Sequence, residues 1–188
     1  MADRLIIGMS GASGAPLTVE LLRQLHVCRP DIETHFVMTR GAELTLRQEC
    51  ALSPDDLRPL VSVWHDPDEI GASIASGSFP VMGMVVVPCS MKTAAGIHSG
   101  YSDNLLLRAA DVCLKERRKL VLVTRESPLS TIHLRNLFEL SSYGAVILPP
   151  MPAYYQKPQT MAECTRQIVG RILFQFGLSG ELFTWEGM

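Results

Sequence analysis

Charged side chains are scarce in this 188-residue sequence, and neither sign dominates. Only 19% of the residues are Asp, Glu, Lys or Arg, with 17 basic against 19 acidic residues. This balance argues against a surface for nucleic acid or for an acidic membrane, so we expect neither partner. The composition is instead 47% hydrophobic, which suffices for a packed core and leaves apolar surface for contacts between copies of the chain.

Metal-binding and disulfide patterns are also lacking. The five cysteines are an odd number and form no CxxC pair, and the five histidines form no HxH or HExxH motif. We expect reduced thiols in an intracellular protein and no metal site. Cys89 is the one thiol that we consider as a nucleophile, with a packed cysteine as the simpler interpretation.

Long hydrophobic runs are absent. The apolar run near the N-terminus is too short for a signal peptide, and the longest later run, residues 81–87 (VMGMVVV), has the length of a strand. We therefore expect a cytoplasmic protein without a membrane segment.

Strand and helix signals alternate along the chain. Short valine- and leucine-rich runs predict strands at residues 4–9, 34–38, 81–87, 119–124 and 145–148. Helical spacing of apolar residues predicts helices at residues 16–25, 42–50, 94–98, 104–116, 131–142 and 160–176, with another short helix starting at Ser53. This alternation predicts a three-layer αβα fold, Rossmann- or flavodoxin-like, with a mostly parallel sheet in a single domain over residues 1–188.

Small and polar residues follow several of the predicted strands, where ligands of such sheets bind. Residues 8–14 (GMSGASG) do not meet the GxGxxG dinucleotide pattern, and an empty tight turn explains them as well as a ligand does. Ser90 and Thr93 suit a phosphate, although helix capping also explains a serine there. Two such loops together favour a nucleotide-sized cofactor. Residues 71–80 (GASIASGSFP) form the loosest segment, a candidate mobile loop over a site.

Basic residues gather in the second half of the chain. Arg108, residues 115–118 (KERR) and Arg125 can bind phosphate through charge-assisted hydrogen bonds. For residues 115–118, a solvated helix end explains the same charges. The proline-rich residues 149–158 can hold an aromatic side chain rigidly, or serve as a surface linker.

The order of these segments along the chain is similar to that of one family. The segments SGASG (10–14), SGSF (76–79), PCSMKT (88–93), RAADV (108–112), LKERR (114–118), LVLVTRE (120–126) and PPMPAYY (149–155) together resemble the UbiX-type flavin prenyltransferases. The resemblance runs from about Leu5 to Trp185, and the short tail at Trp185 points to members associated with phenolic-acid decarboxylases.

The resemblance implies an activity, a cofactor and partners. Such proteins join a dimethylallyl group from a dimethylallyl phosphate to N5 and C6 of reduced FMN, without a metal. The product, prenylated FMN, is the cofactor of UbiD-type decarboxylases. The family forms a large homo-oligomer, usually a dodecamer, with sites at subunit contacts.

The resemblance also assigns site residues. It places FMN against Gly11, Ala12, Ser13, Thr39, Ser90, Met91, Lys92, Thr93 and Arg125, with Ser13 near flavin N5. It places the prenyl phosphate against Glu49, Arg108, Lys115, Arg125, Glu126, Tyr155 and Arg171, some of them from a neighbouring subunit. Trp185 is a further candidate for the substrate site, because it or Tyr155 could contact the allyl cation through a cation–π interaction. Ser13, Glu49, Lys115 and Glu126 are the expected catalytic residues, with Glu126 as proton donor to the phosphate and then as base.

Two other functions stay open at this point. An FMN-carrying accessory subunit of an aromatic-acid decarboxylase would need the flavin loops but no second phosphate site. A flavin-dependent cysteine decarboxylase of the same fold would need an asparagine segment in place of residues 89–93 and a methionine-asparagine clamp, and the sequence has neither.

Overall fold

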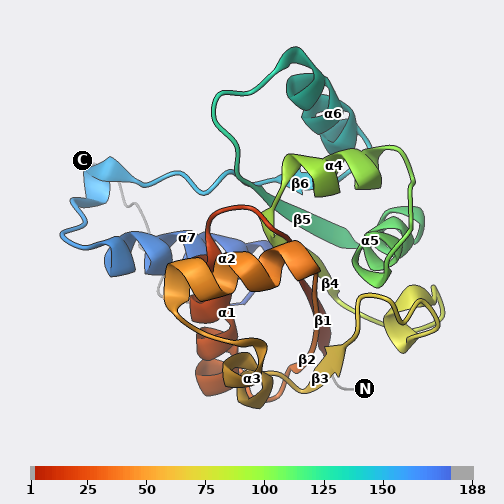
Figure 1. Ribbon diagram of the computed structural model, residues 1–188, viewed down its shortest axis with the longest axis horizontal. Helices are drawn as coiled ribbons and strands as arrows, with labels where there is room; N and C mark the ends of the chain where they lie inside the picture. Colours follow the sequence, from red (N-terminus) through yellow and green to blue (C-terminus); the bar gives the residue numbers. More distant parts are fainter. Residues whose placement is uncertain (1–2, 179–188) are drawn as a thin grey trace.

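A computed structural model describes residues 3–178. One six-stranded sheet, fully parallel, runs through its centre in the order β3-β2-β1-β4-β5-β6 (Figure 1). The strands are β1 (Arg4–Met9), β2 (Glu33–Met38), β3 (Val63–His65), β4 (Gly83–Cys89), β5 (Lys119–Thr124) and β6 (Val146–Ile147). The order reverses between β1 and β4, which is where ligands of such sheets bind.

Helices cover both faces of the sheet (Figure 1). On one side lie α1 (Ala15–Cys28), α2 (Arg40–Cys50), the short α3 (Pro54–Leu57) and α7 (Met161–Gln175). On the other lie α4 (Met91–His98), α5 (Leu105–Lys115) and α6 (Thr131–Ser142). Three 3₁₀ turns complete the described elements: η1 (Arg58–Leu60), η2 (Ser73–Ala75) and η3 (Tyr154–Gln156).

Alternation along the strands divides the core between the two faces. In β4, Val85 and Val87 pack toward α1 and α7, whereas Met84 and Val86 pack toward α4 and α5. Both sets are fully buried, as expected for a parallel strand that is covered on both sides. The predicted three-layer αβα fold with a parallel sheet is confirmed.

Most predicted element bounds agree with the structure to within three residues, and the differences have local causes. Strand β3 was not predicted, because only three residues form it and its one neighbour in the sheet is β2. Pro88 and Cys89, predicted as a turn, extend strand β4. Helix α4 begins three residues before the predicted start, because Ser90 caps it.

Residues 71–80 are not the loose loop that their glycine and serine content predicts. Arg108 Nε donates to the carbonyl oxygen of Ala75 (3.2 Å), and Arg118 donates to the carbonyl oxygens of Gly77 and Phe79. Ile74 is buried in the core under α5. Helix α5 and the turn after it therefore hold this segment in place.

Candidate active site

The site is built where β1 and β4 end side by side. The Oγ atom of Ser10 donates to the carbonyl oxygen of Pro88 (2.9 Å) and accepts from the backbone N–H of Ser90 (2.8 Å). Ser10 is 1% exposed, so these hydrogen bonds are shielded from water. They join the turn after β1 to the start of α4 and fix the distance between the two loops.

The turn after β1 approaches α2 very closely. A Cβ atom on Gly11 would lie 2.9 Å from the backbone carbon of Gly41, which is closer than real Cβ contacts. Gly14 has φ of 124°, in the region that favours glycine. The small residues of this turn therefore have a packing reason, and they leave backbone groups open toward a ligand.

Helix α1 begins at Gly14, which has no side chain to cap it. Glu49, in the last turn of α2, caps the helix instead, because its Oε2 atom accepts from the backbone N–H groups of Gly14 and Ala15, both at 2.9 Å. Burial pushes the pKa of Glu49 upward. The Ser13 hydroxyl, the two amides and the charge of Arg125 outweigh burial and leave the pKa below its ordinary value. Glu49 is thus an anion that holds Ser13 in place.

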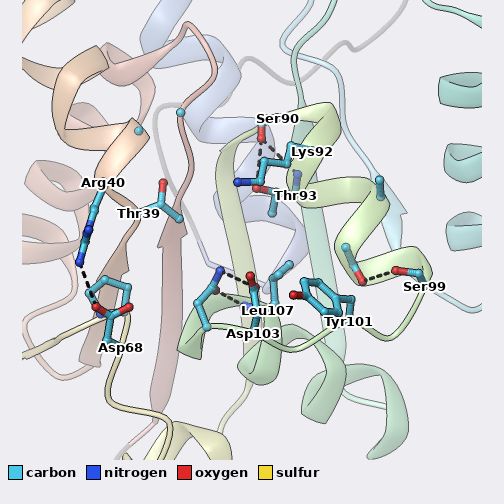
Figure 2. A pocket seen from close by; sticks show the side chains of 16 residues that line it. Thr39, Arg40, Asp68, Ser90, Lys92, Thr93, Ser99, Tyr101, Asp103 and Leu107 are labelled. Carbon is cyan, nitrogen blue, oxygen red and sulfur yellow. Dashed lines mark hydrogen bonds and ion pairs between the residues drawn. The ribbon is translucent and has the colours of Figure 1, made fainter.

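Two helix N-termini open into the same space. The Thr39 side chain accepts from the backbone N–H of Ala42 (3.3 Å) at the start of α2. The Ser90 side chain accepts from Thr93 N–H (3.2 Å) and donates to the Thr93 hydroxyl (3.0 Å) at the start of α4 (Figure 2). The remaining free N–H groups and the positive ends of both helix dipoles favour an anion between them.

A cavity of about 730 Å³ occupies this space. That volume suits a cofactor-sized ligand. Its lining combines polar side chains with glycines and a few apolar groups: Gly11, Thr39, Arg40, Gly41, Pro67, Asp68, Ser90, Lys92, Thr93, Ala95, Gly96, Ser99, Tyr101, Asp103, Asn104 and Leu107 (Figure 2).

Five of the residues predicted to contact FMN line this cavity together: Gly11, Thr39, Ser90, Lys92 and Thr93. Ala12 and Met91 do not line it; their side chains are buried, with that of Met91 in the apolar core beneath α4. These two residues can therefore contact a ligand only through their backbone groups. Ser13 and Arg125 are exposed at the same edge of the sheet.

Sequence reasoning missed several cavity residues. Arg40 and Asp68 form an ion pair (3.3 Å) at one side of the cavity, and Tyr101 and Asp103 lie at another (Figure 2). Arg40 could have been found from the sequence, because it directly follows Thr39, which was predicted to contact FMN. The others lie in loops that only the fold brings to the cavity.

The residues expected to bind the prenyl phosphate lie at more than one place in the chain. Arg108 pairs with Asp111 (2.8 Å), and Lys115 at the end of α5 pairs with Glu116. Lys115 comes eight residues after Leu107, so it lies roughly 12 Å further along the helix from the cavity. One copy of the chain does not bring Lys115 to the cavity.

Glu126, Tyr155 and Arg171 are exposed. Glu126 follows β5, and its carboxylate accepts from the backbone N–H of Ser127 (3.1 Å). Tyr155 lies in η3 after the proline-rich segment, and the Arg171 guanidinium lies 5.6 Å from the centre of the Phe174 ring. Trp185 lies outside the described residues.

The structure contradicts a nucleophilic role for Cys89. The residue is fully buried, and burial raises the pKa of its thiol to about 12. A thiol that stays protonated and inaccessible is not a nucleophile. Cys89 is a core residue beneath α4.

Residues 3–178 contain no group of three or more side chains placed to hold a metal ion. Within the same range, no helix has both the length and the apolar character needed to cross a membrane.

Known proteins are similar to this chain over nearly its whole length. Residues 2–173 match the Flavoprotein family. A probable UbiX-like flavin prenyltransferase of Streptomyces sp. (strain D7) is 52% identical over 186 residues, covering 98% of this chain and 92% of the relative.

Two solved structures superpose closely. The dodecameric FMN-dependent UbiX-like decarboxylase of Escherichia coli O157:H7 has 51% identity and a TM-score of 0.95, covering 98% of this chain and 100% of that one. AnUbiX (PadA1), in complex with FMN and dimethylallyl pyrophosphate, has 47% identity and a TM-score of 0.96, with both chains fully covered. The chain belongs to the flavoprotein family and, within it, to the UbiX-type flavin prenyltransferases.

Proposed function

We propose that this protein transfers a dimethylallyl group from a dimethylallyl phosphate to N5 and C6 of reduced FMN. The product, prenylated FMN, serves a UbiD-type decarboxylase. The observation that carries this proposal is the cavity between the N-termini of α2 and α4, in a chain 47% identical over its full length to AnUbiX, which was solved with FMN and dimethylallyl pyrophosphate. We propose that residues 1–188 form one flavin-binding domain.

The residues at the cavity suit FMN. The close approach of Gly11 and Gly41 leaves backbone groups uncovered, and Thr39, Ser90 and Thr93 add hydroxyls. Lys92 brings a cation to the same wall. We assign FMN to Gly11, Ala12, Ser13, Thr39, Arg125 and residues 90–93. When bound, reduced FMN supplies the nucleophilic atoms of the reaction.

Cleavage of an allylic C–O bond leaves a phosphate with additional negative charge. Arg and Lys side chains stabilise that charge more strongly in the transition state than in the ground state, which lowers the barrier. We assign this role to Arg108, Lys115, Arg125 and Arg171, with Tyr155 and Trp185 as walls for the allyl cation. Glu126 donates a proton to the phosphate and later accepts one, and Glu49 positions Ser13.

A Glu126→Gln variant tests the assignment of the proton donor. The amide keeps the shape of the side chain but cannot donate the proton, so FMN binding should persist while prenylated flavin fails to form. Asp55→Asn is a suitable control, because Asp55 is exposed on α3 and pairs with Arg58. Normal product formation by Glu126→Gln would overturn the assignment.

We propose that the working form is a homo-oligomer, as in the dodecameric Escherichia coli relative. The segment after β6 extends away from the sheet toward η3 and α7 (Figure 1). It carries strongly exposed apolar side chains, among them Met151, Tyr154 and Met161. Contacts between copies would bury these side chains, and they would also bring Arg108 and Lys115 of one copy to the cavity of another.

The two alternatives make different predictions at a second anion site. An FMN carrier needs no second phosphate site, and a cysteine decarboxylase has no site for dimethylallyl phosphate, whereas a prenyltransferase has one. Inorganic phosphate should therefore compete with dimethylallyl phosphate for the FMN-bound protein, and no competition would favour the alternatives. We also propose a cytoplasmic location, which suits the free thiols of Cys28 and Cys50.

A further inference from the structure

Two buried histidines form a direct hydrogen bond outside the residues assigned so far. His35 Nδ1 lies 2.9 Å from His65 Nε2, and the two rings are stacked at 17°. His35 is 2% exposed and His65 is 5% exposed. The bond joins β2 to β3, which is the last strand of the sheet on that side and only three residues long.

The neighbouring groups fix which nitrogen atoms carry protons. Arg4 Nε donates to Glu33 Oε2 (2.9 Å), and this bond lowers the pKa of Glu33 and keeps it ionised. Glu33 Oε1 lies 3.1 Å from His35 Nε2, and an ionised carboxylate can only accept, so His35 Nε2 carries a proton. In a neutral ring Nδ1 is then bare, and it accepts from the Nε2–H group of His65.

This chain of hydrogen bonds leads to the wall of the cavity. His65 ends β3, and the next residues are Asp66, Pro67 and Asp68. Pro67 and Asp68 line the cavity. The carbonyl oxygen of Pro67 accepts from Leu105 N–H (2.8 Å) at the start of α5, and Asp68 pairs with Arg40 at the start of α2. The wall thus spans the gap between α2 and α5, and its N-terminal end is anchored by His65.

We propose that His35 and His65 are positioning residues of the flavin site: their hydrogen bond, in the neutral state of both rings, holds Pro67 and Asp68 in the place that FMN binding requires. This inference rests on the proposed function. It makes FMN affinity sensitive to mild acid through groups that do not touch the ligand.

The direction of the pH effect follows from the surroundings of the pair. Burial lowers the pKa of both histidines. For His35, Glu33 opposes this and Arg4 adds to it; for His65, the charge of His35 adds to it and Glu69 opposes it. The first proton taken up by the pair leaves the bond in place, because His65 can change tautomer and accept from His35 Nδ1–H. When both rings are protonated, two donors face each other and the bond is lost. The contribution is therefore complete above the ordinary histidine pKa of about 6.5, and it is lost as the pH falls through the lower values of the folded protein.

The test compares FMN dissociation constants of the wild type and His65→Gln from about pH 7.5 down to the lowest pH at which both proteins stay folded. Glutamine does not titrate and can keep the link in either state of His35: its amide N–H donates to bare Nδ1, and its amide oxygen accepts from Nδ1–H once His35 is protonated. Taking the ratio of the two constants at each pH cancels the titration of the FMN phosphate, whose second pKa is about 6. We expect the wild type to lose roughly three- to tenfold in affinity relative to His65→Gln across this range, as for the loss of one hydrogen bond.

His26→Gln is the matched control, because His26 is exposed on α1, and it should follow the wild type. Parallel curves for the wild type and His65→Gln would overturn the inference while leaving the proposed function intact. Failure of the wild type to bind FMN at pH 7.5 would instead contradict the proposed function.

Imidazole ¹⁵N spectra of the wild-type protein provide a second measurement that needs no variant. Both rings should carry their proton on Nε2 at neutral pH. A proton on His35 Nδ1 would overturn the inference even if His65→Gln failed to fold.

Discussion

Glu49 caps a helix to which it does not belong: its carboxylate lies 2.9 Å from the backbone nitrogen of Ala15, 34 residues earlier in the chain. The same oxygen accepts from Gly14, and the Ser13 hydroxyl also bonds to this carboxylate. The Glu49 carboxylate on α2 therefore sets the conformation of the turn that contains Ser13, the residue that we assign a place near flavin N5.

Replacing Glu49 by alanine should lower the free energy of unfolding by about 1 kcal/mol, the usual value of a helix cap. The pKa of Glu49 lies below its ordinary value, so this contribution is present above that ordinary value and is lost as the pH falls through the folded-state pKa. The difference between wild type and variant in urea unfolding should shrink in acid. Glu43→Ala, which removes an exposed pair with Arg47 on the same helix, is the control.

Gly11→Ala should abolish FMN binding. Its Cβ atom would lie 2.9 Å from the backbone of Gly41, so the turn after β1 and the start of α2 must move apart. Gly71→Ala is the comparison, because no atom lies within 4 Å of that Cβ position. Equilibrium titration with FMN measures both variants, and retention of wild-type affinity by Gly11→Ala would contradict this description of the turn.

Ser10→Ala should be the most damaging small substitution in the site. It removes a buried donor to Pro88 and leaves the backbone N–H of Ser90 without its partner, which costs about 1–3 kcal/mol. FMN affinity should fall as well, since the loops after β1 and β4 lose their connection. Ser142→Ala, at an exposed serine of α6 that donates to the carbonyl oxygen of Phe138 in its own helix, should change neither quantity. Thermal unfolding with and without FMN measures both effects.

A Lys115→Met protein and a Glu126→Gln protein should each be inactive alone. Mixed oligomers that contain both kinds of chain should be active. Lys115 lies at the end of α5 and does not line the cavity of its own chain, and we propose that in an oligomer it serves the cavity of another copy. In mixed oligomers made by coexpression, about a quarter of the sites would hold both native side chains. Recovered prenyl transfer in the mixture is the expected result, with the double variant as control. No recovery would contradict an active site shared between subunits.

The fold and five of the sixteen residues that line the cavity could be predicted from the sequence. The valine-rich run of β4 and the alternation of strands and helices suffice for the sheet, because burial on both faces imposes a local pattern. Gly11, Ser90 and Thr93 were found because they follow strand ends. These features depend on near neighbours in the chain.

The features that sequence reasoning missed depend on distant partners. Residues 71–80 look flexible by composition, but Arg108 and Arg118 fix their carbonyl groups from helix α5 and the turn after it. Strand β3 is defined by its pairing with β2, and Asp68 reaches the cavity only because β3 ends there. No local signal encodes contacts of this kind.

The most direct test of the central claim is the mass of the flavin after reaction. The purified protein is incubated without oxygen or added metal with reduced FMN and dimethylallyl monophosphate, or with the diphosphate in a parallel sample. The released flavin is then analysed by mass spectrometry. We predict a flavin heavier by one C5H8 unit with at least one donor. Unmodified FMN with both donors, from protein that binds FMN, would contradict the assignment as a flavin prenyltransferase.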